Sequence, residues 1–305
     1  MTEVKFKRLA LVGIGLIGSS IARSARKNDL ADEIVCAART ADSRRVAKEL
    51  GIVDEAKGAD LVIFCTPLGT YGKLAEQVAP ALEKGAILTD VGSVKSAVID
   101  AIGPHVPEGV EFVPGHPVAG TEKSGPAAGF AELFINRWLI LTPCGRASDA
   151  AIEKLTAFWA AMGSKVEIMD ADHHDLVLAI TSHIPHLIAY NIVGTADDLE
   201  DVTQSEVIKY SAGGFRDFTR IAASDPTMWR DVFLHNKEAV LEMLGRFTED
   251  LTALQRAIRR DDGETLFNIF SRTRAIRRQI IDAGQETPEP DFGRTHKSED
   301  AEKKS

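Results

Sequence analysis

Cysteine is scarce in this sequence, and the few cysteines present exclude a disulfide framework and a zinc site. The 305 residues include three cysteines, Cys36, Cys65 and Cys144, which are too few and too scattered for either arrangement. Each lies in an apolar or strand-like context, which is typical of reduced core residues. We therefore expect a cytoplasmic protein with free thiols.

Basic residues are fewer than acidic ones, and the sequence shows neither a long apolar run nor the pattern of an export signal. The chain has 36 Lys and Arg against 45 Asp and Glu, a formal net charge of −9, which disfavours nucleic-acid binding because phosphates reward clustered cations. No uninterrupted apolar run approaches the ~18–20 residues of a membrane span. The apolar N-terminal stretch soon meets Gly13 and Gly15 and lacks a small-residue cleavage site, unlike a signal peptide. We expect neither a nucleic-acid nor a membrane partner.

The first half of the chain alternates short apolar runs with amphipathic stretches. Strands are expected at 8–12, 33–37, 61–65, 86–89, 111–113 and 138–142. Helices are expected at 16–27, 43–50, 71–82 and 94–102. This alternation predicts a parallel sheet with helices on both faces, the α/β fold of a Rossmann-type dinucleotide-binding domain.

The second half is almost entirely helical in pattern. Only 165–168 resembles a strand, and helices are expected at 149–162, 171–199, 203–210, 226–259 and 263–283. Asp170 and Ser224 or Asp225 suit helix N-caps, and Pro226 suits a first helical turn. From Gln285 the chain is polar and lacks apolar periodicity. We predict a Rossmann domain over 1–147, an all-helical domain over 148–284 and a disordered tail over 285–305.

A glycine motif follows the first expected strand. Gly13, Gly15 and Gly18 form GxGxxG between the apolar run LALV and the helical pattern LIGSSIARSAR. In a dinucleotide-binding fold the first glycine makes a tight turn, the second lets backbone approach the pyrophosphate, and the third packs helix on strand. We interpret Gly13, Gly15, Leu16, Ile17 and Gly18 as cofactor-binding, with an ordinary glycine turn as the alternative.

The residues after the second expected strand bear on the choice of cofactor. The NAD fingerprint has an acidic residue there for the ribose 2′-OH, but this sequence has Ala38 followed by Arg39. A guanidinium at that place suits a 2′-phosphate. We therefore favour NADP over NAD and assign Arg39 to the cofactor. The alternative is a solvated Arg39 in an enzyme that uses NAD without the carboxylate.

Ligands of such sheets bind beyond the carboxyl ends of the strands, which directs attention to three further segments. Thr66 and Pro67 follow the strand LVIFC and would line the path to the nicotinamide, or form a plain turn. Ser93 in TDVGSVK would offer a hydroxyl to the crevice, or cap the following helix. His116 in GHPVAG follows the strand EFVP, and we expect a loop histidine with an exposed ring. Such a ring titrates near neutral pH and suits a general base, although a structural histidine is the alternative.

The helical half carries histidines and arginines that are candidate functional residues. His183 and His186 of SHIPH lie one helical turn apart, and Pro185 between them should kink the helix. No acidic third ligand is spaced to complete a metal site, so we expect none. Arg216 and Arg220 follow a glycine pair and suit a two-point grip on a carboxylate, with solvated helix charges as the alternative.

Together these motifs resemble one family. GxGxxG, DVGSVK, GHPVAGTEKSG, SHIPH and GFRDFTRIAASDPTMWRDVFLHNK occur in the order found in the prephenate/arogenate (cyclohexadienyl) dehydrogenases of tyrosine biosynthesis. The resemblance spans residues 6–283. It implies a Rossmann domain followed by an all-α domain that forms a homodimer. It also implies oxidative decarboxylation of prephenate or arogenate to 4-hydroxyphenylpyruvate or tyrosine, with hydride transfer to NAD(P).

The resemblance also implies roles for individual residues. His116 would be the catalytic base, with Ser93 its hydrogen-bond partner at the substrate hydroxyl. His186 and Arg220 would bind substrate, Arg220 through a carboxylate. Four further residues match positions around that pocket: His174, Glu122, Asp217 and Trp229. We find no chorismate mutase segment before the Rossmann domain, and the tail is too short for an ACT domain, so domain-based feedback by tyrosine is not expected.

Two other functions fit the layout less well. A β-hydroxyacid-type dehydrogenase would carry a helical Lys with an Asn four residues later, but Lys209 and Lys237 are followed at that spacing by Gly213 and Leu241. A non-enzymatic dinucleotide sensor has no need for GHPVAG and SHIPH together. The choice between prephenate and arogenate, the choice between NADP and NAD, and inhibition by tyrosine stay open at this point.

Overall fold

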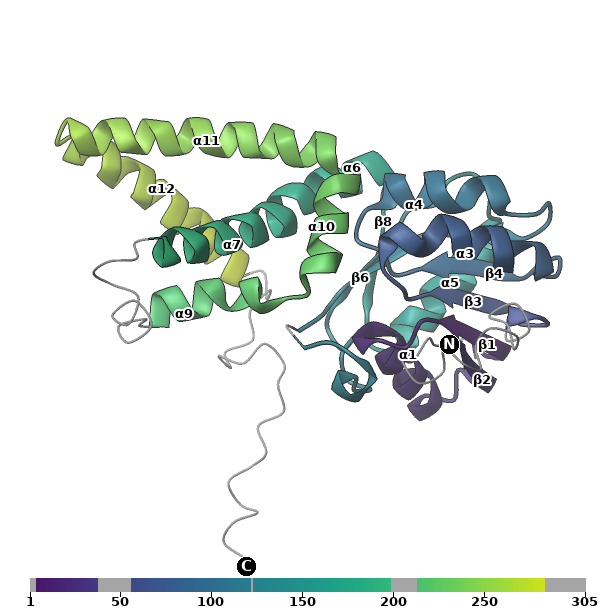
Figure 1. Cartoon of the computed structure of the whole chain (residues 1–305). Coiled ribbons are helices and arrows are strands. Elements are labelled where there is room, and N and C mark those ends of the chain that lie inside the picture. The colour runs from purple at the N-terminus through teal and green to yellow at the C-terminus, as the bar shows by residue number, and fades with distance from the viewer. Residues whose placement is uncertain (1–3, 38–55, 122, 199–212, 283–305) are drawn as a thin grey trace, which may run out of the picture. The chain divides into compact units, whose positions relative to one another are not determined.

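The computed structural model describes residues 4–37, 56–121, 123–198 and 213–282 (Figure 1). The expected helices at 43–50 and 203–210 and the expected tail lie outside the described residues. The chain divides into two compact units, Met1–Met243 and Leu244–Ser305. The domain boundaries at 147 and 284 stay predictions.

The nucleotide-binding half contains a five-stranded parallel sheet, as the sequence predicts. Its strands lie in the order β2-β1-β3-β4-β5. They are β1 (Phe6–Val12), β2 (Ala31–Ala37), β3 (Leu61–Phe64), β4 (Ile87–Asp90) and β5 (Glu111–Phe112). The connecting helices are α1 (Leu16–Lys27), α3 (Tyr71–Val78) and α4 (Lys95–Ile102). The expected bounds agree to within about two residues, except that helix 71–82 ends early in a 3-10 turn.

Alternate residues of each strand enter two separate hydrophobic cores, one on each face of the sheet. Val62 and Phe64 pack under α3 and α4. Leu61 and Ile63 pack against α1 and α5 (Asp149–Ala161) on the opposite face. Figure 1 shows α3 and α4 on one side of β3 and β4, with α1 on the other. The near-continuous apolar strands therefore have the physical cause expected of a doubly covered sheet.

A second sheet was not foreseen. β6 (Gly115–Val118) runs antiparallel to β7 (Trp138–Leu141), which runs parallel to β8 (Lys165–Ile168). The run 138–142, expected in the main sheet, therefore belongs to this smaller one. The segment GHPV is a strand and not a loop, with His116 opposite Ile140 in the register. Its Gly and Pro hid the strand pattern, because both residues are disfavoured in the interior of a strand.

The helical half follows the predicted order, but a π turn interrupts the expected helix 171–199, and Asn236 divides the expected helix 226–259 into two. Its helices are α6 (Ala171–Leu178), α7 (Ile184–Asp197), α9 (Gly213–Thr219), α10 (Pro226–His235), α11 (Lys237–Arg259) and α12 (Gly263–Asp282). A π turn, Ala179–His183, lies directly before α7, and Pro185 falls in the first turn of that helix, where its missing N–H breaks no helical hydrogen bond. The kink expected at Pro185 stays a prediction. Asp225 caps α10 through Oδ1, which accepts from the amides of Thr227 at 2.8 Å and Met228 at 3.0 Å.

Short 3-10 turns complete the described secondary structure. They lie at Leu68–Thr70, Ala79–Ala81, Gly103–His105, Pro126–Ala128 and Arg220–Ala223. The cysteines differ in part from expectation. Cys65 and Cys144 are half-buried, but Cys36 is exposed because β2 is an edge strand. The prediction of a core position is therefore wrong for Cys36.

One helical run in the described part of the chain, Ala171–Asp197, is long and apolar enough to cross a membrane by length and composition. Its mean hydropathy over the most apolar 18 residues is 1.5, and 28% of that window is buried. Helices of soluble proteins meet the same criterion. This run carries buried polar side chains, including His174 and Asp175, that contact the nucleotide-binding half. The absence of a membrane partner stays a prediction.

Candidate active site

The carboxyl ends of three central strands meet at one edge of the main sheet. Val12 lies beside Phe64, and Phe64 lies beside Asp90. The loops that follow therefore begin next to one another. They contain the glycine motif, the Thr66-Pro67 pair and Ser93. The structure thus gathers the predicted cofactor residues at the edge where parallel sheets bind ligands.

The three glycines of the motif have three different structural reasons. Gly13 has a φ of +101°, and a Cβ there would lie 2.7 Å from Thr66 Cγ2. A Cβ on Gly18 would overlap the carbonyl oxygen of Gly13. A Cβ on Gly15 would meet nothing within 4 Å, so the backbone at Gly15 borders open space. A tight turn, close packing and an approachable backbone are the three roles that a dinucleotide-binding turn requires.

The start of α1 is suited to an anion. Leu16 and Ile17 open the helix, Gly15 is the N-cap without a side-chain cap, and the first turn has no acidic residue. The amides of that turn and the positive end of the helix dipole therefore face the open space beside Gly15. These residues fit the pyrophosphate of a dinucleotide. Arg39, assigned to the cofactor from the sequence, lies outside the described residues.

Thr66 and Pro67 border this edge, and the hydrogen bonds that the structure shows for them lie within their own turn. The Thr66 hydroxyl lies 2.7 Å from the Thr70 hydroxyl, which also donates to the Pro67 carbonyl at 2.7 Å. Pro67 is exposed, and Thr66 is half-buried. The segment is an ordered turn at the carboxyl end of β3, so both residues lie where the sequence predicts, and their role in cofactor binding stays a prediction.

His116 is buried, contrary to the expectation of an exposed loop ring. Its exposed fraction is 9%, because strand β6 carries it into the interior. His116 Nδ1 lies 2.8 Å from His174 Nε2. His174 Nδ1 in turn lies 2.8 Å from Asp175 Oδ1. Two histidines and a carboxylate therefore form a continuous hydrogen-bonded chain across 58 residues of sequence.

Asp175 anchors this chain to the start of α4. Its two oxygens accept from the amides of Lys95 at 2.7 Å and Ser96 at 2.9 Å. Burial by itself would raise the pKa of Asp175, but the bonds from His174 and these amides hold it below its ordinary value. Asp175 is therefore an ionised acceptor that also caps a helix from a distant segment.

Ser93 does not cap α4. The N-cap of α4 is Val94 and has no side-chain cap bond, so the interpretation of Ser93 as a helix cap is wrong. Ser93 is half-buried in the loop between β4 and α4. The predicted role of Ser93 as the hydrogen-bond partner of His116 stays a prediction.

The charge on Asp175 determines which ring nitrogens carry protons. An ionised carboxylate accepts, so His174 donates through Nδ1–H and, when neutral, accepts at Nε2. His116 then donates through Nδ1–H, and its Nε2 keeps a lone pair. Burial, followed by the neighbouring His174, Lys95 and His183, holds the pKa of His116 well below its ordinary value. His116 is therefore a neutral base at physiological pH, and the expectation that it titrates near neutrality is wrong.

A buried ion pair holds the two segments on which Ser93 and His116 lie. Lys95 Nζ lies 2.7 Å from Asp90 Oδ2 and also donates to the Gly115 carbonyl at 2.5 Å. Asp90 accepts from the amides of Gly92 at 2.6 Å and Gly115 at 3.1 Å. Burial raises the pKa of Asp90 and lowers that of Lys95, and their pairing opposes both shifts.

The π turn and α10 bring an aromatic cluster to the same region. His186 stacks on Trp229 with ring centroids 3.7 Å apart, and His183 lies edge-on to the same indole at 6.0 Å. His183 is fully buried, and Asn236 Nδ2 lies 3.0 Å from its Nδ1. Burial lowers the pKa of His186, and the nearby Arg220 guanidinium lowers it further. Arg220 therefore lies close enough to His186 to act on its charge, and the assignment of both residues to the substrate stays a prediction.

The sequence analysis missed several residues of the candidate site, and two of its predicted residues are not placed there. Asp90, Lys95, Asp175 and Asn236 received no role from the sequence, although three of them fall inside or directly beside quoted motifs. No local spacing signals the contacts of Asp175 with Lys95 and of Asn236 with His183, which join distant segments. Asp90 and Lys95 are only five residues apart, but their pairing needs the buried end of the strand. Arg216 is exposed and pairs with Asp217 at 3.2 Å, which favours the solvated alternative for Arg216. Glu122 lies outside the described residues.

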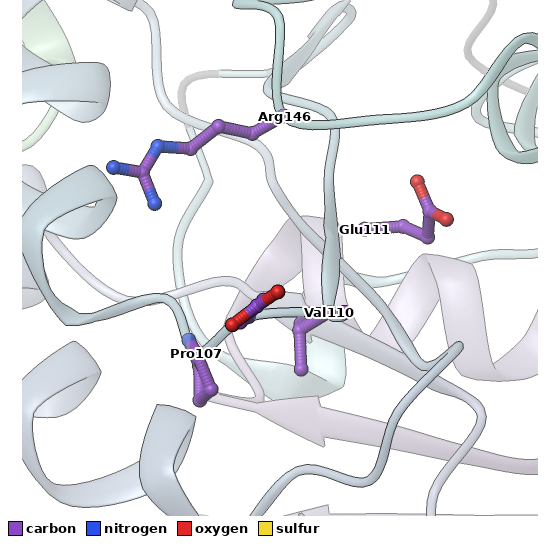
Figure 2. Close-up of a pocket in the computed structure, with 6 residues that line it drawn as sticks. Pro107, Val110, Glu111 and Arg146 are labelled. Atoms are coloured by element: carbon purple, nitrogen blue, oxygen red, sulfur yellow. The ribbon is translucent and has the colours of Figure 1, made fainter.

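Two further features do not define the site. The described residues contain no group of three or more His, Cys, Asp or Glu side chains suited to hold a metal ion. A hollow of about 280 Å³ lies at the opposite, amino edge of the sheet, where Figure 2 shows Arg146 and Glu111 pointing apart. Glu111 accepts from the Ser148 amide at 2.6 Å, so its carboxylate serves the start of α5.

A parallel sheet with an approachable glycine turn at its carboxyl edge, together with a buried and oriented histidine, is typical of a dinucleotide-dependent dehydrogenase. Residues 21–168 match the family model described as prephenate dehydrogenase, nucleotide-binding domain. Residues 170–272 match the model described as prephenate dehydrogenase, dimerization domain. The chain belongs to the prephenate dehydrogenase family.

Individual relatives agree with this assignment. A cyclohexadienyl dehydrogenase from Zymomonas mobilis is 41% identical over 280 residues, covering 89% of this chain and 95% of that protein. The structure of prephenate dehydrogenase from A. aeolicus in complex with hydroxyphenyl propionate and NAD+ has a TM-score of 0.78 and 34% identity, covering 91% of this chain and 99% of that one. The structure of arogenate dehydrogenase from Synechocystis has a TM-score of 0.72 and 25% identity, covering 89% of this chain and 99% of that one.

These comparisons confirm the predictions of family, fold class and enzyme class. The chain is a pyridine-nucleotide-dependent oxidoreductase with a Rossmann-type domain followed by a helical dimerisation domain. Oxidative decarboxylation in tyrosine biosynthesis, the function predicted from the sequence, is confirmed at the level of the family.

Proposed function

We propose that this chain oxidatively decarboxylates prephenate, arogenate or both, with His116 as the base. The observation that carries the proposal is the His116–His174–Asp175 chain beside the carboxyl edge of the sheet. The substrate is a cyclohexadiene with a hydroxyl at C4 and a carboxylate on the ring. A neutral His116 with a free Nε2 lone pair suits removal of the hydroxyl proton.

The hydrogen-bonded chain also stabilises the product of that proton transfer. When His116 Nε2 takes the proton, the positive imidazolium donates through Nδ1–H to His174, which is held by the ionised Asp175. The loss of the hydroxyl proton accompanies the departure of hydride from C4. The ring carboxylate then leaves as CO2, and its bonding electrons enter the ring, which becomes aromatic. Ser93 orients the hydroxyl toward His116 in this proposal.

The nicotinamide of a bound dinucleotide would accept the hydride. Gly13, Gly15, Leu16, Ile17 and Gly18 would hold its pyrophosphate at the start of α1, and Thr66 and Pro67 would border the nicotinamide end. Arg39 would face the 2′ position of the adenosine ribose. With Ala38 in place of an acidic residue, we propose that NADP is accepted at least as well as NAD.

Substrate recognition falls to the cluster from the helical half. His186, held against Trp229, and its neighbour Arg220 would bind the substrate, with Arg220 gripping a carboxylate. His174 contacts the base directly, and Glu122 is assigned to the pocket by resemblance. Binding energy from these groups would hold C4 and its hydroxyl in a reactive orientation.

We further propose a cytoplasmic homodimer formed through the helical domain. The second unit exposes large apolar side chains on α12: Phe267, Phe270, Ile276, Ile280 and Ile281. Apolar side chains in such number on one helix are typical of a surface that a second subunit covers. The match to a dimerization-domain model supports the same assembly. Sedimentation at micromolar concentration tests it, and a monomer would contradict it.

The proposed reaction is tested by assaying both substrates against both cofactors. We expect NAD(P)H to form with prephenate, arogenate or both, together with stoichiometric CO2. The four values of kcat/KM also establish the preferred substrate and cofactor. Absence of turnover with every combination would refute the proposed function.

A further inference from the structure

His183 presents a buried ring nitrogen without a partner. Its side chain lies on the π turn and has an exposed fraction of 0%. Among the residues that the structure describes, Nε2 has no hydrogen-bond partner and no contact with the surface. A buried polar atom of this kind is costly unless another molecule satisfies it.

Asn236 determines which of the two ring nitrogens of His183 carries the proton. The Asn236 Nδ2 atom lies 2.9 Å from the backbone carbonyl oxygen of Asp175. A carbonyl oxygen can only accept, so this atom of Asn236 must be the amide nitrogen. The same nitrogen lies 3.0 Å from His183 Nδ1, which must therefore accept. A neutral histidine that accepts at Nδ1 carries its proton on Nε2.

The surroundings keep His183 in this neutral form. Burial lowers the pKa of His183 to about 4. Among its titratable neighbours, the Asp175 carboxylate raises this pKa, and His174 and His186 lower it. Protonation would also place a second N–H against the amide of Asn236. The unpartnered Nε2 is therefore a donor of fixed orientation over the whole physiological range.

His183 lies among residues already placed in the site. Its ring is edge-on to Trp229, on which His186 stacks. His183 is also near enough to His116 to affect the charge on that base. Among the described residues this N–H donor has no acceptor, and its nitrogen has no exposed surface, so a ligand atom reaches it only when the surrounding side chains move. The oxygen atoms of a dicarboxylate substrate are acceptors.

We infer that His183 donates its Nε2–H to a substrate oxygen and that Asn236 is the positioning residue that holds this tautomer. The inference rests on the proposed function, because it takes the ligand to be the cyclohexadiene dicarboxylate. The acceptor is a carboxylate or carbonyl oxygen of that molecule. His183 thereby joins His186 and Arg220 as a further substrate contact, one that binds through a neutral group.

The tautomer is tested on the free protein by 15N NMR of the histidine rings. The signal of His183 is identified by its disappearance in His183→Gln. We expect wild-type His183 to show a protonated Nε2 and an unprotonated Nδ1 at neutral pH. In Asn236→Asp the partner becomes an acceptor, and Nδ1 should become protonated. A wild-type ring protonated on Nδ1 would overturn the inference.

Substrate binding is tested with two replacements of His183 and a matched control. His183→Leu removes the donor and should raise KM for the dicarboxylate about 10- to 100-fold. His183→Gln keeps an amide donor near the place of Nε2 and should recover most of this loss. The exposed His173 lies outside the site, and His173→Gln should leave KM unchanged. Equal KM values in His183→Leu and the wild type would overturn the inference.

The product 4-hydroxyphenylpyruvate, which lacks the ring carboxylate, distinguishes the possible acceptors. Weaker binding of substrate alone in His183→Leu assigns the donor to the ring carboxylate. Weaker binding of both ligands assigns it to the side chain or the C4 oxygen. A wild-type protein that turns over neither dicarboxylate refutes the proposed function instead, while the NMR measurement still determines the tautomer.

Discussion

The Lys95 ammonium and the Asp90 carboxylate form a fully buried ion pair, with Nζ 2.7 Å from Oδ2. The pair binds the backbone of Gly92, next to Ser93, and of Gly115, next to His116. It thus connects the main sheet to the smaller one through the segments on which Ser93 and His116 lie. A Cβ on Gly92 would lie 2.9 Å from Asp90 Oδ2, closer than the buried ion pair allows. A Cβ on Gly115 would lie 3.2 Å from the Asp90 carbonyl oxygen, which is a tight contact.

Lys95→Met should destabilise the fold by about 3–5 kcal/mol, because it leaves the Asp90 charge buried and unpaired. The double variant Lys95→Met, Asp90→Leu should recover much of this stability. It should still lower kcat, because the amides of Gly92 and Gly115 lose their acceptor and the segments carrying Ser93 and His116 shift. Denaturant unfolding and steady-state kinetics measure the two effects. A double variant with wild-type kcat would show that the pair serves stability alone.

His116→Asn should lower kcat by roughly 10²–10⁴ and leave cofactor affinity nearly intact, as expected when a general base is removed. In the wild type the base acts when neutral, so activity should be lost as pH falls through its pKa. Because that pKa is held well below the ordinary value, the loss should occur at more acid pH than for an exposed histidine. A pH profile of kcat/KM with an acid limb at 6.5 or above would contradict this.

Arg220→Ala should chiefly weaken substrate binding, since a charge-assisted contact to a carboxylate contributes about 1.5–3 kcal/mol, or roughly 10- to 150-fold in affinity. Arg216→Ala is the matched control, because Arg216 is exposed and paired with Asp217. We expect KM to rise in the first variant and to stay unchanged in the second. The reverse result would move the carboxylate site to Arg216.

Arg39→Ala should raise KM for NADP by an amount worth about 1–3 kcal/mol, because a guanidinium contact to the 2′-phosphate is lost. KM for NAD should barely change, because NAD lacks this phosphate. Ala38→Asp should shift the preference toward NAD, since a carboxylate repels that phosphate. The comparison of kcat/KM for both cofactors measures each effect. Equal harm to both cofactors, or to neither, in Arg39→Ala would mean that Arg39 does not recognise the 2′ position.

Stability should fall in mild acid through His183. Its pKa is about 4 in the folded protein against an ordinary value of 6.5, so the unfolded chain binds a proton that the folded chain refuses between these values. The free energy of unfolding therefore decreases as pH falls from 6.5 toward 4, by roughly 3 kcal/mol, since each pKa unit is worth about 1.4 kcal/mol. His183→Gln should flatten this part of the profile. An unchanged slope in that variant would assign the acid sensitivity to other groups.

Local patterns in the sequence were sufficient for the main parallel sheet and for the cofactor turn, but not for the smaller second sheet. The alternation of apolar strands with amphipathic helices predicts the parallel sheet, and Gly13, Gly15 and Gly18 occupy the positions that the turn requires. These features are determined by neighbours within a few residues in the chain. Periodicity and turn chemistry therefore report them directly.

The chemistry of the site was decided by contacts between segments far apart in the chain. His116 became a buried base because β6 pairs with β7 and brings it against His174, and neither contact has a local signature. The carboxylate of Asp175 caps a helix 80 residues earlier, and Asn236 determines the tautomer of a histidine 53 residues earlier. Protonation states depend on burial and on the partner of each ring nitrogen. Only the folded chain determines those two quantities, because burial and pairing arise when distant segments pack together.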